Sequence, residues 1–522
     1  MKRRITTVSR MALTACVAGG LLTGSAAHAQ KSADFNGDGI ADLAVGAPHE
    51  NIGALISAGA VHIICGSSVQ LTASGSQFWH QNSSGVLDAS EIDDRFGSAL
   101  ACGDFNKDGF ADLAIGIPGE DLGSIYDAGA VAILYGSPNS LRSNGNQIWH
   151  QDSTGIADAA EEGDEFGAAL AARDFNKDGF ADLAIGVPGE DVGDIVDAGI
   201  VHILYGSATG LNRKFSQVWW QGSGGMLDAA ETGDRFGSSL VAADFTGDGI
   251  GDLAVGAPGQ MVNAFADAGA VHVMLGSLSR LTATGNQVFT QDAIGLDASE
   301  EGDSFGWALA AADFNKDKKA DLVIGAPFED VGEITEAGAV HVLYSTATGP
   351  AAVNSLFLHQ SVEGMPDFAE QRDWFGFALA AADFNRDGFA DLAIGSPFET
   401  IDEHTETGAV FVLQGSLTGV TTTNAALWHQ DTPNVPGDNA QWDNFGSALT
   451  VGDYNGDNKL DLVVAVPGDD FPNVVDGGSI TVLYSGGAVG LTSTGCQCWH
   501  QNVSGIADKC EPDDYFGDSL GR

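Results

Sequence analysis

Short apolar runs alternate with polar stretches rich in Gly and Asp along nearly the whole chain. In one stretch, the segment DEFGAALAARDF and the loop NKDGF precede the apolar run ADLAIGVP (181–188). An acidic loop, the run IVHILYGS (200–207) and the weaker segment FSQVWWQ (215–221) follow. Short apolar runs closed by Gly and Pro are typical of buried strands. The pattern therefore predicts four short strands, and it shows no long stretch with a helical period.

This group of four strands repeats about every seventy residues. Twisted open sheets rarely exceed about ten strands, whereas radial repetition of four-stranded blades leaves only short edges. The sequence therefore predicts an all-β fold, a seven-bladed β-propeller. An open solenoid is the alternative, but it would need atypical capping repeats. The phrase D-F/Y-N/T-x-D begins, at spacings of 69 or 70 residues, at Asp34, Asp104, Asp174, Asp244, Asp313, Asp383 and Asp453.

The first and last units are each incomplete in a complementary way. The loop 34–42 has no FG pair before it, and the last FG pair, Phe516-Gly517, has no such loop after it. Joined end to end, YFGDSLGR (515–522) and SADFNGDGIADLAVGAP form a nearly complete unit. We therefore expect residues 513–522 to supply the first strand of the N-terminal blade and close the ring. The repeat units begin near residues 34, 94, 164, 234, 303, 373 and 443.

The N-terminus has the composition of a secretory signal peptide. Residues 1–29 combine four basic residues, an apolar stretch and the small-residue exit AHA, which predicts cleavage near Ala29. The mature chain, 30–522, would then be a single exported propeller. A lipobox at LTAC, with Cys16 as a lipidated N-terminus, is a competing interpretation, but only five residues separate Arg10 from Cys16. No other stretch approaches the roughly 18 apolar residues of a membrane helix.

The charge of the chain is strongly negative. Its formal value is −49, and loss of the four basic residues in 1–29 makes it −53. Such a surface repels phosphate, so nucleic acid and anionic membranes are excluded as partners. Solubility and a saline habitat each account for such a charge, but the repeats favour bound cations as a major cause.

Five cysteines remain after processing. Cys510 is a disulfide candidate with either Cys496 or Cys498, since an exported protein meets oxidising conditions. Cys65 and Cys102 stand where other repeats have Tyr135 and Ala172, and we expect them to be small buried apolar residues.

The repeated Asp-rich loop has the ligand spacing of a cation site. Oxygen side chains stand at positions 1, 3, 5 and 9, a backbone carbonyl serves position 7, and Gly at position 6 permits a sharp turn. This is the front half of the EF-hand ligand scheme, with a position-9 Asp in place of the Glu at position 12. Hard oxygen ligands select Ca²⁺, up to seven ions here, over Zn²⁺ or copper. A metal-free Asx turn would explain one copy of the loop. Seven copies would place 21 carboxylates at close range, where they repel one another, so the set favours bound cations.

Two of the loops depart from the consensus in ways that predict weaker binding. Thr246 replaces the amide at position 3, and Lys318 replaces the Gly at position 6, where φ is expected to be positive. In the loop 453–461, position 6 is Asn458, and Asn tolerates a positive φ better than Lys does. We therefore expect the 313 loop to bind Ca²⁺ most weakly. The predicted ligands are Asp34, Asn36, Asp38, Ile40 and Asp42; Asp104, Asn106, Asp108, Phe110 and Asp112; Asp174, Asn176, Asp178, Phe180 and Asp182; Asp244, Thr246, Asp248, Ile250 and Asp252; Asp313, Asn315, Asp317, Lys319 and Asp321; Asp383, Asn385, Asp387, Phe389 and Asp391; and Asp453, Asn455, Asp457, Lys459 and Asp461.

These motifs together resemble a known family. FG pairs, as at 96–97, and GAP-like triplets, as at 46–48, bracket a DxNxDGxxD loop, and this order is similar to the FG-GAP repeats of integrin α-subunit propellers. The last unit departs with AVP (465–467), and all seven loops are complete. The resemblance implies a seven-bladed propeller with Ca²⁺ in the loops between first and second strands. It also implies ligand recognition on the opposite face, which includes the acidic loops 119–129 and 150–167.

The function expected from these features is an extracellular, calcium-binding adhesion or binding module for a protein or glycan ligand. We expect the propeller to be a monomer. An extracellular scaffold or surface-structure component without a discrete ligand is the first alternative, and a hydrolase that uses the propeller face is the second. We expect no enzymatic activity, although FG-GAP repeats also accompany catalytic domains, as in glycosylphosphatidylinositol-specific phospholipase D. The sequence has no GxSxG or HExxH motif and no separate catalytic domain before Asp34. The recurring WHQ motifs are expected to be structural, because an active site needs one asymmetric constellation.

Overall fold

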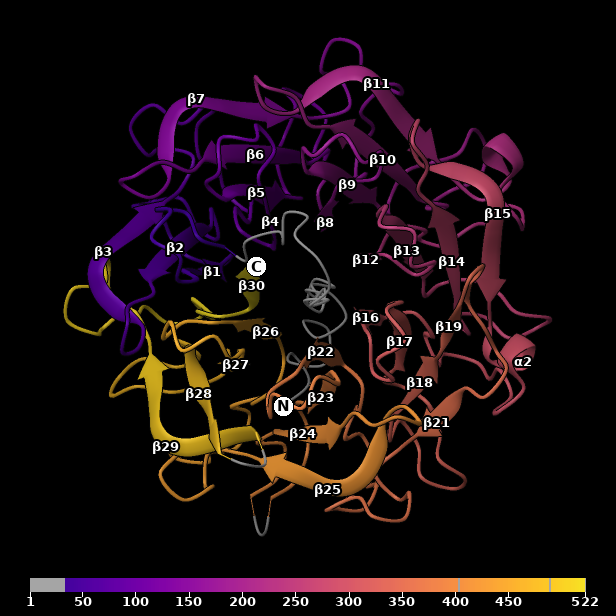
Figure 1. The fold of residues 1–522 in the computed structure, drawn as a ribbon. Coiled ribbons are helices and arrows are strands. Elements are labelled where there is room, and N and C mark those ends of the chain that lie inside the picture. Colours follow the sequence, from indigo (N-terminus) through magenta and orange to yellow (C-terminus); the bar gives the residue numbers. More distant parts are fainter. Residues whose placement is uncertain (1–32, 402–403, 488–489, 522) are drawn as a thin grey trace.

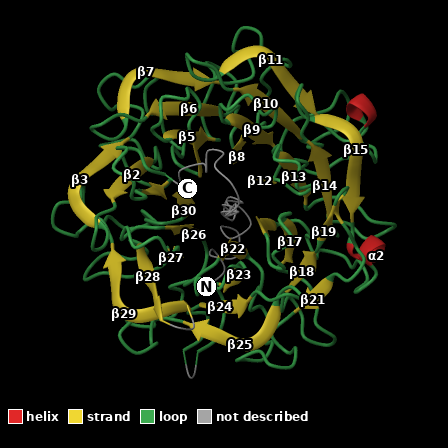
Figure 2. Ribbon diagram, viewed as in Figure 1, coloured by secondary structure: helices red, strands yellow, loops and turns green. Residues whose placement is uncertain are grey.

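The computed structural model describes residues 33–401, 404–487 and 490–521. The predicted signal peptide, with Cys16, lies outside these residues. Within them, strands form seven four-stranded antiparallel sheets arranged around a central axis (Figure 1). The two helical turns in this part of the chain, η1 (Ser223–Gly225) and α2 (Gln291–Ile294), are at the rim (Figure 2). The predicted all-β, seven-bladed propeller is confirmed.

Five blades follow one simple order, in which the first strand is nearest the axis and the fourth is at the rim. In each blade the apolar second and third strands are completely or almost completely buried, which explains their continuous apolar runs. These blades are β4 (Ala99–Gly103), β5 (Asp112–Ile117), β6 (Ala130–Tyr135) and β7 (Arg142–Trp149); β8 (Ala169–Arg173), β9 (Asp182–Val187), β10 (Ile200–Tyr205) and β11 (Asn212–Trp219); β12 (Ser239–Ala243), β13 (Asp252–Ala257), β14 (Ala270–Leu275) and β15 (Thr282–Phe289); β22 (Ala378–Ala382), β23 (Asp391–Ser396), β24 (Ala409–Gln414) and β25 (Thr421–Trp428); and β26 (Leu449–Gly452), β27 (Asp461–Val466), β28 (Ser479–Gly487) and β29 (Gly490–Trp499).

Two blades differ from this order. The blade of β16 (Ala308–Ala312), β17 (Asp321–Ala326), β18 (Ala339–Leu343) and the short β21 (Leu356–Leu358) carries an additional hairpin, β19 (Ser345–Thr346) and β20 (Gly349–Pro350). The first blade contains β1 (Leu43–Ala47), β2 (Ala60–Cys65), β3 (Thr72–Trp79) and, from the other end of the chain, β30 (Ser519–Gly521). β30 pairs antiparallel with β1, with Val45 opposite Leu520.

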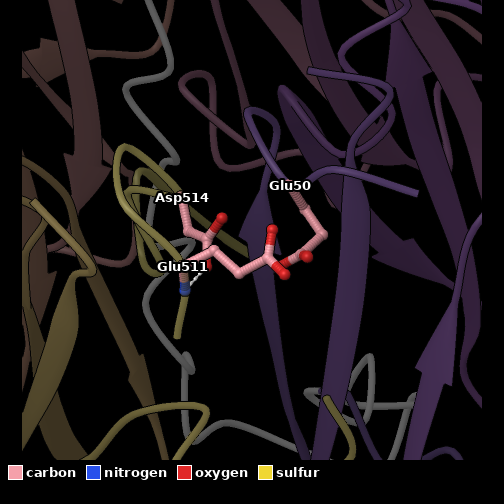
Figure 3. Close-up of side chains that lie close together, drawn as sticks. All are labelled: Glu50, Glu511 and Asp514. Carbon is pink, nitrogen blue, oxygen red and sulfur yellow. Dashed lines mark hydrogen bonds between the residues drawn. The ribbon is translucent and has the colours of Figure 1, made fainter. Parts of the chain in front are cut away.

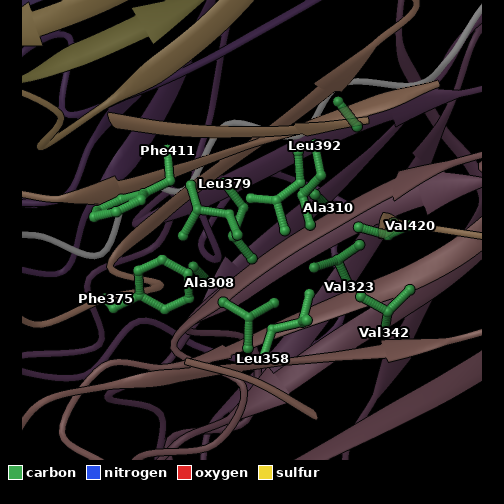
Figure 4. Close-up of a cluster of buried hydrophobic side chains, with 14 of the residues drawn as sticks. Ala308, Ala310, Val323, Val342, Leu358, Phe375, Leu379, Leu392, Phe411 and Val420 are labelled. Carbon is green, nitrogen blue, oxygen red and sulfur yellow. The ribbon is translucent and has the colours of Figure 1, made fainter. Parts of the chain in front are cut away.

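The hydrophobic core lies between adjacent blades. In one cluster, Val323 and Val342 of one blade pack with Leu379, Leu392 and other side chains of the next (Figure 4). The innermost strands β16 and β22 both read ALAAA, and their four Ala side chains suit the close approach of the sheets near the axis.

The FG and GAP motifs meet at these blade junctions. A Cβ atom added to Gly116 of one blade would lie 2.1 Å from the carbonyl oxygen of Gly167 in the next, so the close approach requires glycine. The amide of Phe166 also donates across the junction to the carbonyl of Ala128, at 3.0 Å. Equivalent bonds run from Phe96 to Ala58, Phe236 to Ala198, Phe305 to Ala268, Phe375 to Ala337, Phe445 to Thr407 and Phe516 to Gly477.

Candidate metal sites and ligand face

Six of the seven Asp-rich loops connect the first and second strands of a blade, and the loop 34–42 leads into β1, the second strand of the first blade, so all seven share one face of the propeller. In the loop 174–182, Asp174 accepts from the amides of Asp178 and Gly179, at 3.2 and 2.7 Å. Asn176 accepts from the amide of Asp178, and Asp178 accepts from that of Phe180. The loop backbone thus turns around its own oxygen side chains, and similar bonds hold the other six loops.

The Asp at position 9 is different, because it is buried and belongs to the strand. Asp182 is 0% exposed and accepts from the amides of Phe175 and Gly206, both at 2.9 Å. Burial raises its pKa to about 8, with smaller contributions from the charges of Asp174 and Asp178. This residue therefore joins the loop to the third strand whether or not it also binds an ion. The same pair of bonds forms at Asp42, Asp112, Asp252, Asp321, Asp391 and Asp461.

The donor set of these loops fits Ca²⁺. Side-chain oxygens at positions 1, 3 and 5 lie beside a buried carboxylate, and hard oxygen ligands are those that Ca²⁺ takes. Among the described residues, the groups of three carboxylates within 4.8 Å of one another do not include these loops. The predicted ligands share one short segment in each loop, and ion binding there stays a prediction.

Two loops contain a competing cation of their own. Lys319 Nζ lies 3.0 Å from Asp317 Oδ2, and Lys459 Nζ lies 3.4 Å from Asp457 Oδ2. Lys318, at position 6, has φ of 73°, as expected for a position that favours glycine. The 313 loop therefore combines backbone strain with an internal ammonium group.

The histidines of the third strands are buried against the FG motifs. His202 lies with its ring centroid 5.5 Å from that of Phe166, and His272 lies 5.3 Å from Phe236. Burial lowers the pKa of both histidines to about 4. They are therefore neutral packing groups.

The predicted disulfide is absent from the structure. Cys496 donates its thiol to the carbonyl of Asn434, and Cys510 Sγ lies 3.9 Å from Nδ1 of His500. All five cysteines of the described chain are free, and Cys65 and Cys102 are buried as expected. Proximity along the chain does not determine the direction of the Cβ atoms, which a disulfide requires.

On the face opposite the Asp-rich loops, carboxylates are buried at the blade junctions. Glu120 follows β5, and Gln81, the last residue of a WHQ motif, donates to it at 2.5 Å. Asp94, just before an FG pair, accepts from the amide of Glu91, also at 2.5 Å. Burial raises the pKa of Glu120 to about 9 and that of Asp94 to about 7. The sequence assigned these acidic loops to a ligand-recognition face, but it did not reveal the buried contacts.

The same face carries an aromatic patch that sequence reasoning also missed. The patch comprises the half-buried Trp307, Phe328, Trp374, Phe377 and Phe398, at the start of β16 and β22 and the end of β17 and β23. Trp374 lies 4.3 Å from Phe398 and 5.0 Å from Phe328, between ring centroids. The sequence does contain a signal of this patch, because the five aromatic residues belong to two units and depart from the repeat consensus. In the unit around β12, the positions of Trp374, Phe377 and Phe398 hold Arg235, Ser238 and Gly259.

These features define a class: an all-β, seven-bladed propeller with a repeated acidic loop on one face. The chain belongs to the FG-GAP repeat family. The FG-GAP repeat matches residues 32–64, 96–134, 166–204, 236–274, 305–343, 375–413 and 445–483. The chain is also similar to integrin alpha-7 of Rattus norvegicus, at 33% identity over 162 residues, which cover 31% of this chain and 12% of the integrin. The integrin-like FG-GAP propeller expected from the motifs is thus confirmed.

Other relatives are enzymes. Phosphatidylinositol-glycan-specific phospholipase D of Bos taurus is 30% identical over 337 residues, and that of Homo sapiens is 30% identical over 332. Each alignment covers 62% of this chain and 37% of the relative. The expectation that the chain is not an enzyme is therefore corrected: matches to named enzymes extend over more than half of it. The motif search could not detect this, because the match lies in the repeats themselves.

The likeness of this chain to solved structures is too weak to indicate a function. A rhamnogalacturonan lyase of Bacillus licheniformis covers 81% of this chain and 83% of its own, at 10% identity and a TM-score of 0.32. In the described part of the chain, no helix is long and apolar enough to cross a membrane.

Proposed function

We propose that this chain is an exported, Ca²⁺-binding FG-GAP propeller that recognises a glycan through its aromatic patch. The observation that carries the proposal is asymmetry: five aromatic side chains, Trp307, Phe328, Trp374, Phe377 and Phe398, gather in two adjacent blades. The first blade holds a single smaller pair, Tyr515 and His49, at the positions of Trp374 and Phe398. Residues that every blade shares serve the common scaffold, whereas a ligand needs one distinct surface. The patch also lies on the face opposite the proposed metal loops.

Aromatic side chains suit a sugar ligand. Phe and Trp offer large apolar faces, onto which the C–H faces of a sugar ring pack, and the indole N–H adds a polar contact. In the structure the indole Nε1 of Trp374 donates to Glu336 Oε2, at 3.5 Å. The phospholipase D relatives are named as specific for phosphatidylinositol glycans, which supports the same ligand class.

Calcium in the Asp-rich loops would stiffen the scaffold that presents this patch. Each loop is tied to its neighbour, since the amide of Ala181 donates to the carbonyl of Asp104 at 3.0 Å and Lys107 Nζ donates to that of Asp178 at 2.9 Å. Ions bound with dissociation constants of about 10⁻⁴–10⁻³ M would stay bound outside the cell and would dissociate inside it. Export would therefore complete the fold.

A glycan array probed with the full chain tests the proposal. We expect a defined set of glycans to bind the wild-type protein and not the Trp374→Ala variant. A pull-down from the native cell envelope covers the alternatives. Capture of a protein by the same patch would replace the glycan with a protein ligand, and no specific capture in either experiment would favour a scaffold role.

A second candidate function is hydrolysis of phosphatidylinositol glycans. It is supported by the similarity to phospholipases D over 62% of the chain. Incubation of the purified chain with a glycan-anchored reporter on vesicles tests it directly. Release of the reporter at a rate that scales with protein concentration would support this activity, and no release above buffer would contradict it.

A further inference from the structure

Three carboxylates converge where the first and last blades meet. Glu50 follows β1, while Glu511 and Asp514 lie in the loop between β29 and β30 (Figure 3). One oxygen from each lies within 4.8 Å of those of the other two. Glu50 and Asp514 are 1% and 0% exposed, and Glu511 is exposed. The cluster thus has a buried floor and one solvent-facing ligand.

A second cluster with the same geometry lies at another junction. Glu399 follows β23, and Glu370 and Asp373 lie in the loop between β21 and β22. Their oxygens also lie within 4.8 Å of one another, with Glu399 and Asp373 buried and Glu370 exposed. In both clusters Glu and Asp are three residues apart in the loop, and the amide of that Glu donates to the Asp at 2.5 Å.

Each cluster also contains a buried amide oxygen without a partner, as do the equivalent Gln residues of the other units. Gln501 is 1% exposed and donates its amide nitrogen to Glu50, while its Oε1 is buried and has no hydrogen-bond partner among the described residues. Oδ1 of Asp514 is also buried and unpartnered. In the second cluster Gln360, 0% exposed, donates to Glu399 and leaves its Oε1 equally unpartnered. Buried oxygens of this kind normally have a partner.

No positive side chain supplies that partner. The ion pairs within the described residues involve none of these carboxylates. A bound cation would satisfy both the carboxylates and the amide oxygens. Oxygens on one Ca²⁺ lie 2.3–2.6 Å from the ion, and so at most about 5 Å from one another, which matches the spread of both clusters.

We propose that these two junction clusters are Ca²⁺ sites of a second class, on the face opposite the Asp-rich loops. The ligands are Glu50, Glu511, Asp514 and Gln501 in one site, and Glu399, Glu370, Asp373 and Gln360 in the other. Each ion links the loop after the second strand of one blade to the loop that enters the same blade from its neighbour. The proposal does not depend on the glycan function or on occupancy of the Asp-rich loops.

The chain offers a natural comparison at the junction before β12. There Gln260 stands in place of Glu399, and Gln221 donates to it, so one carboxylate is missing from an otherwise similar arrangement. Oε1 of Gln221 and Oδ1 of Asp234 are unpartnered here too, so the missing carboxylate alone distinguishes this junction, and we expect no bound ion there. The substitution Gln260→Glu restores the acidic group and is expected to add one bound ion.

Terbium luminescence separates the two classes of site in the full-length protein. Trp374 is adjacent to Asp373, whereas none of the seven Asp-rich loops contains Trp. Excitation of Trp alone should therefore report Tb³⁺ at the junction, and added Ca²⁺ should abolish the emission. If wild-type protein shows no Trp-sensitised emission that Ca²⁺ can displace, the proposal is overturned, whatever the variants do.

Isosteric variants then assign the ions. Glu399→Gln is expected to lose most of the Trp-sensitised emission and to bind one Ca²⁺ fewer by equilibrium dialysis, with circular dichroism confirming the fold. Asp387→Asn, in the Asp-rich loop of the same blade, is the matched control and should keep the emission. An unchanged Ca²⁺ count in Glu399→Gln, with loss of an ion in Asp387→Asn, would refute the junction site and leave the loop sites intact.

Discussion

The two faces of the propeller differ in how faithfully they repeat. On one face, seven loops place nearly the same oxygen atoms in the same positions, and each position-9 Asp makes the same two backbone contacts. On the other face, the junctions share a Glu–Gln contact in most units, but two adjacent blades add five aromatic side chains. The repeated features are those that hold the ring together, since every junction between blades must be built alike. The departures from it identify the surface proposed to meet a ligand.

Both faces depend on the first blade, and the largest effect should come from removing its inner strand. Deletion of residues 513–521 removes the pairing of β30 with β1 and exposes the sites of Phe516 and Leu520, both 0% exposed. Burial of these two side chains alone contributes about 3–6 kcal/mol. We expect loss of a cooperative thermal transition, measured by calorimetry. Leu240→Ala, an inner-strand change within one unit, is the control and should only lower the melting temperature. A truncated chain that melts like the full-length protein would contradict this dependence.

Removal of calcium should affect the loop face next most strongly. With free Ca²⁺ at about ten times the dissociation constant, each occupied loop adds about 1.4 kcal/mol to the free energy of unfolding. Excess EDTA should therefore lower the melting temperature, and Ca²⁺ should restore it better than Mg²⁺, which prefers to keep its waters. An unchanged melting temperature in EDTA would show that the loops are stable turns without ions.

On the opposite face, Trp374→Ala should weaken ligand binding with little effect on stability. A central aromatic anchor contributes about 2 kcal/mol or more, which corresponds to at least a roughly thirtyfold rise in Kd. Arg235→Ala changes the equivalent residue in another unit and should leave the Kd unchanged. Titration of a glycan from the array measures both variants. Equal affinities would exclude the aromatic patch as the contact surface.

Differences among the loops themselves should be smaller. Asp178→Asn and Asp317→Asn each remove a position-5 carboxylate without touching the buried position-9 Asp, whose loss would also break two backbone contacts. We expect Asp178→Asn to remove a tighter binding step from a calorimetric Ca²⁺ titration than Asp317→Asn, because Lys319 already occupies the carboxylate of Asp317. If Asp317→Asn instead removed the tighter binding step, the prediction that the 313 loop binds Ca²⁺ most weakly would be wrong.

The smallest effect is expected from relief of backbone strain. Lys318→Gly removes a side chain from a residue with φ of 73° and should stabilise the chain by about 1 kcal/mol. Asn458→Gly, at φ of 62° in the equivalent position, should gain less, since Asn tolerates this conformation. Urea unfolding of both variants in EDTA separates strain from ion binding. A larger gain for Asn458→Gly would disprove the explanation.

Much of the fold could be predicted because its signals are local and repeated. Apolar runs such as 181–188 and 200–207 became the buried strands β9 and β10, since their length and flanking Gly and Pro residues leave few other structures. The Asp-rich loops were equally readable, because their ligand spacing lies within nine residues. The double role of Asp182 was not, because its partner Gly206 is 24 residues away.

The features of the opposite face depend on contacts between distant segments. Glu50 and Gln501 are 451 residues apart and meet only because the first blade takes its inner strand from the C-terminal part of the chain. The pairing of cysteines likewise cannot be read from their spacing, and all five cysteines of the described chain are free in the structure.

The sequence by itself determined the number of blades, the strands within each and the loops with the spacing of a cation site. All of these follow from periodicity and from turn chemistry within a few residues. The tertiary structure alone decided which carboxylates are buried together and which aromatic residues share one surface. Those properties arise at junctions between blades, where the packing of separate sheets sets both distance and exposure.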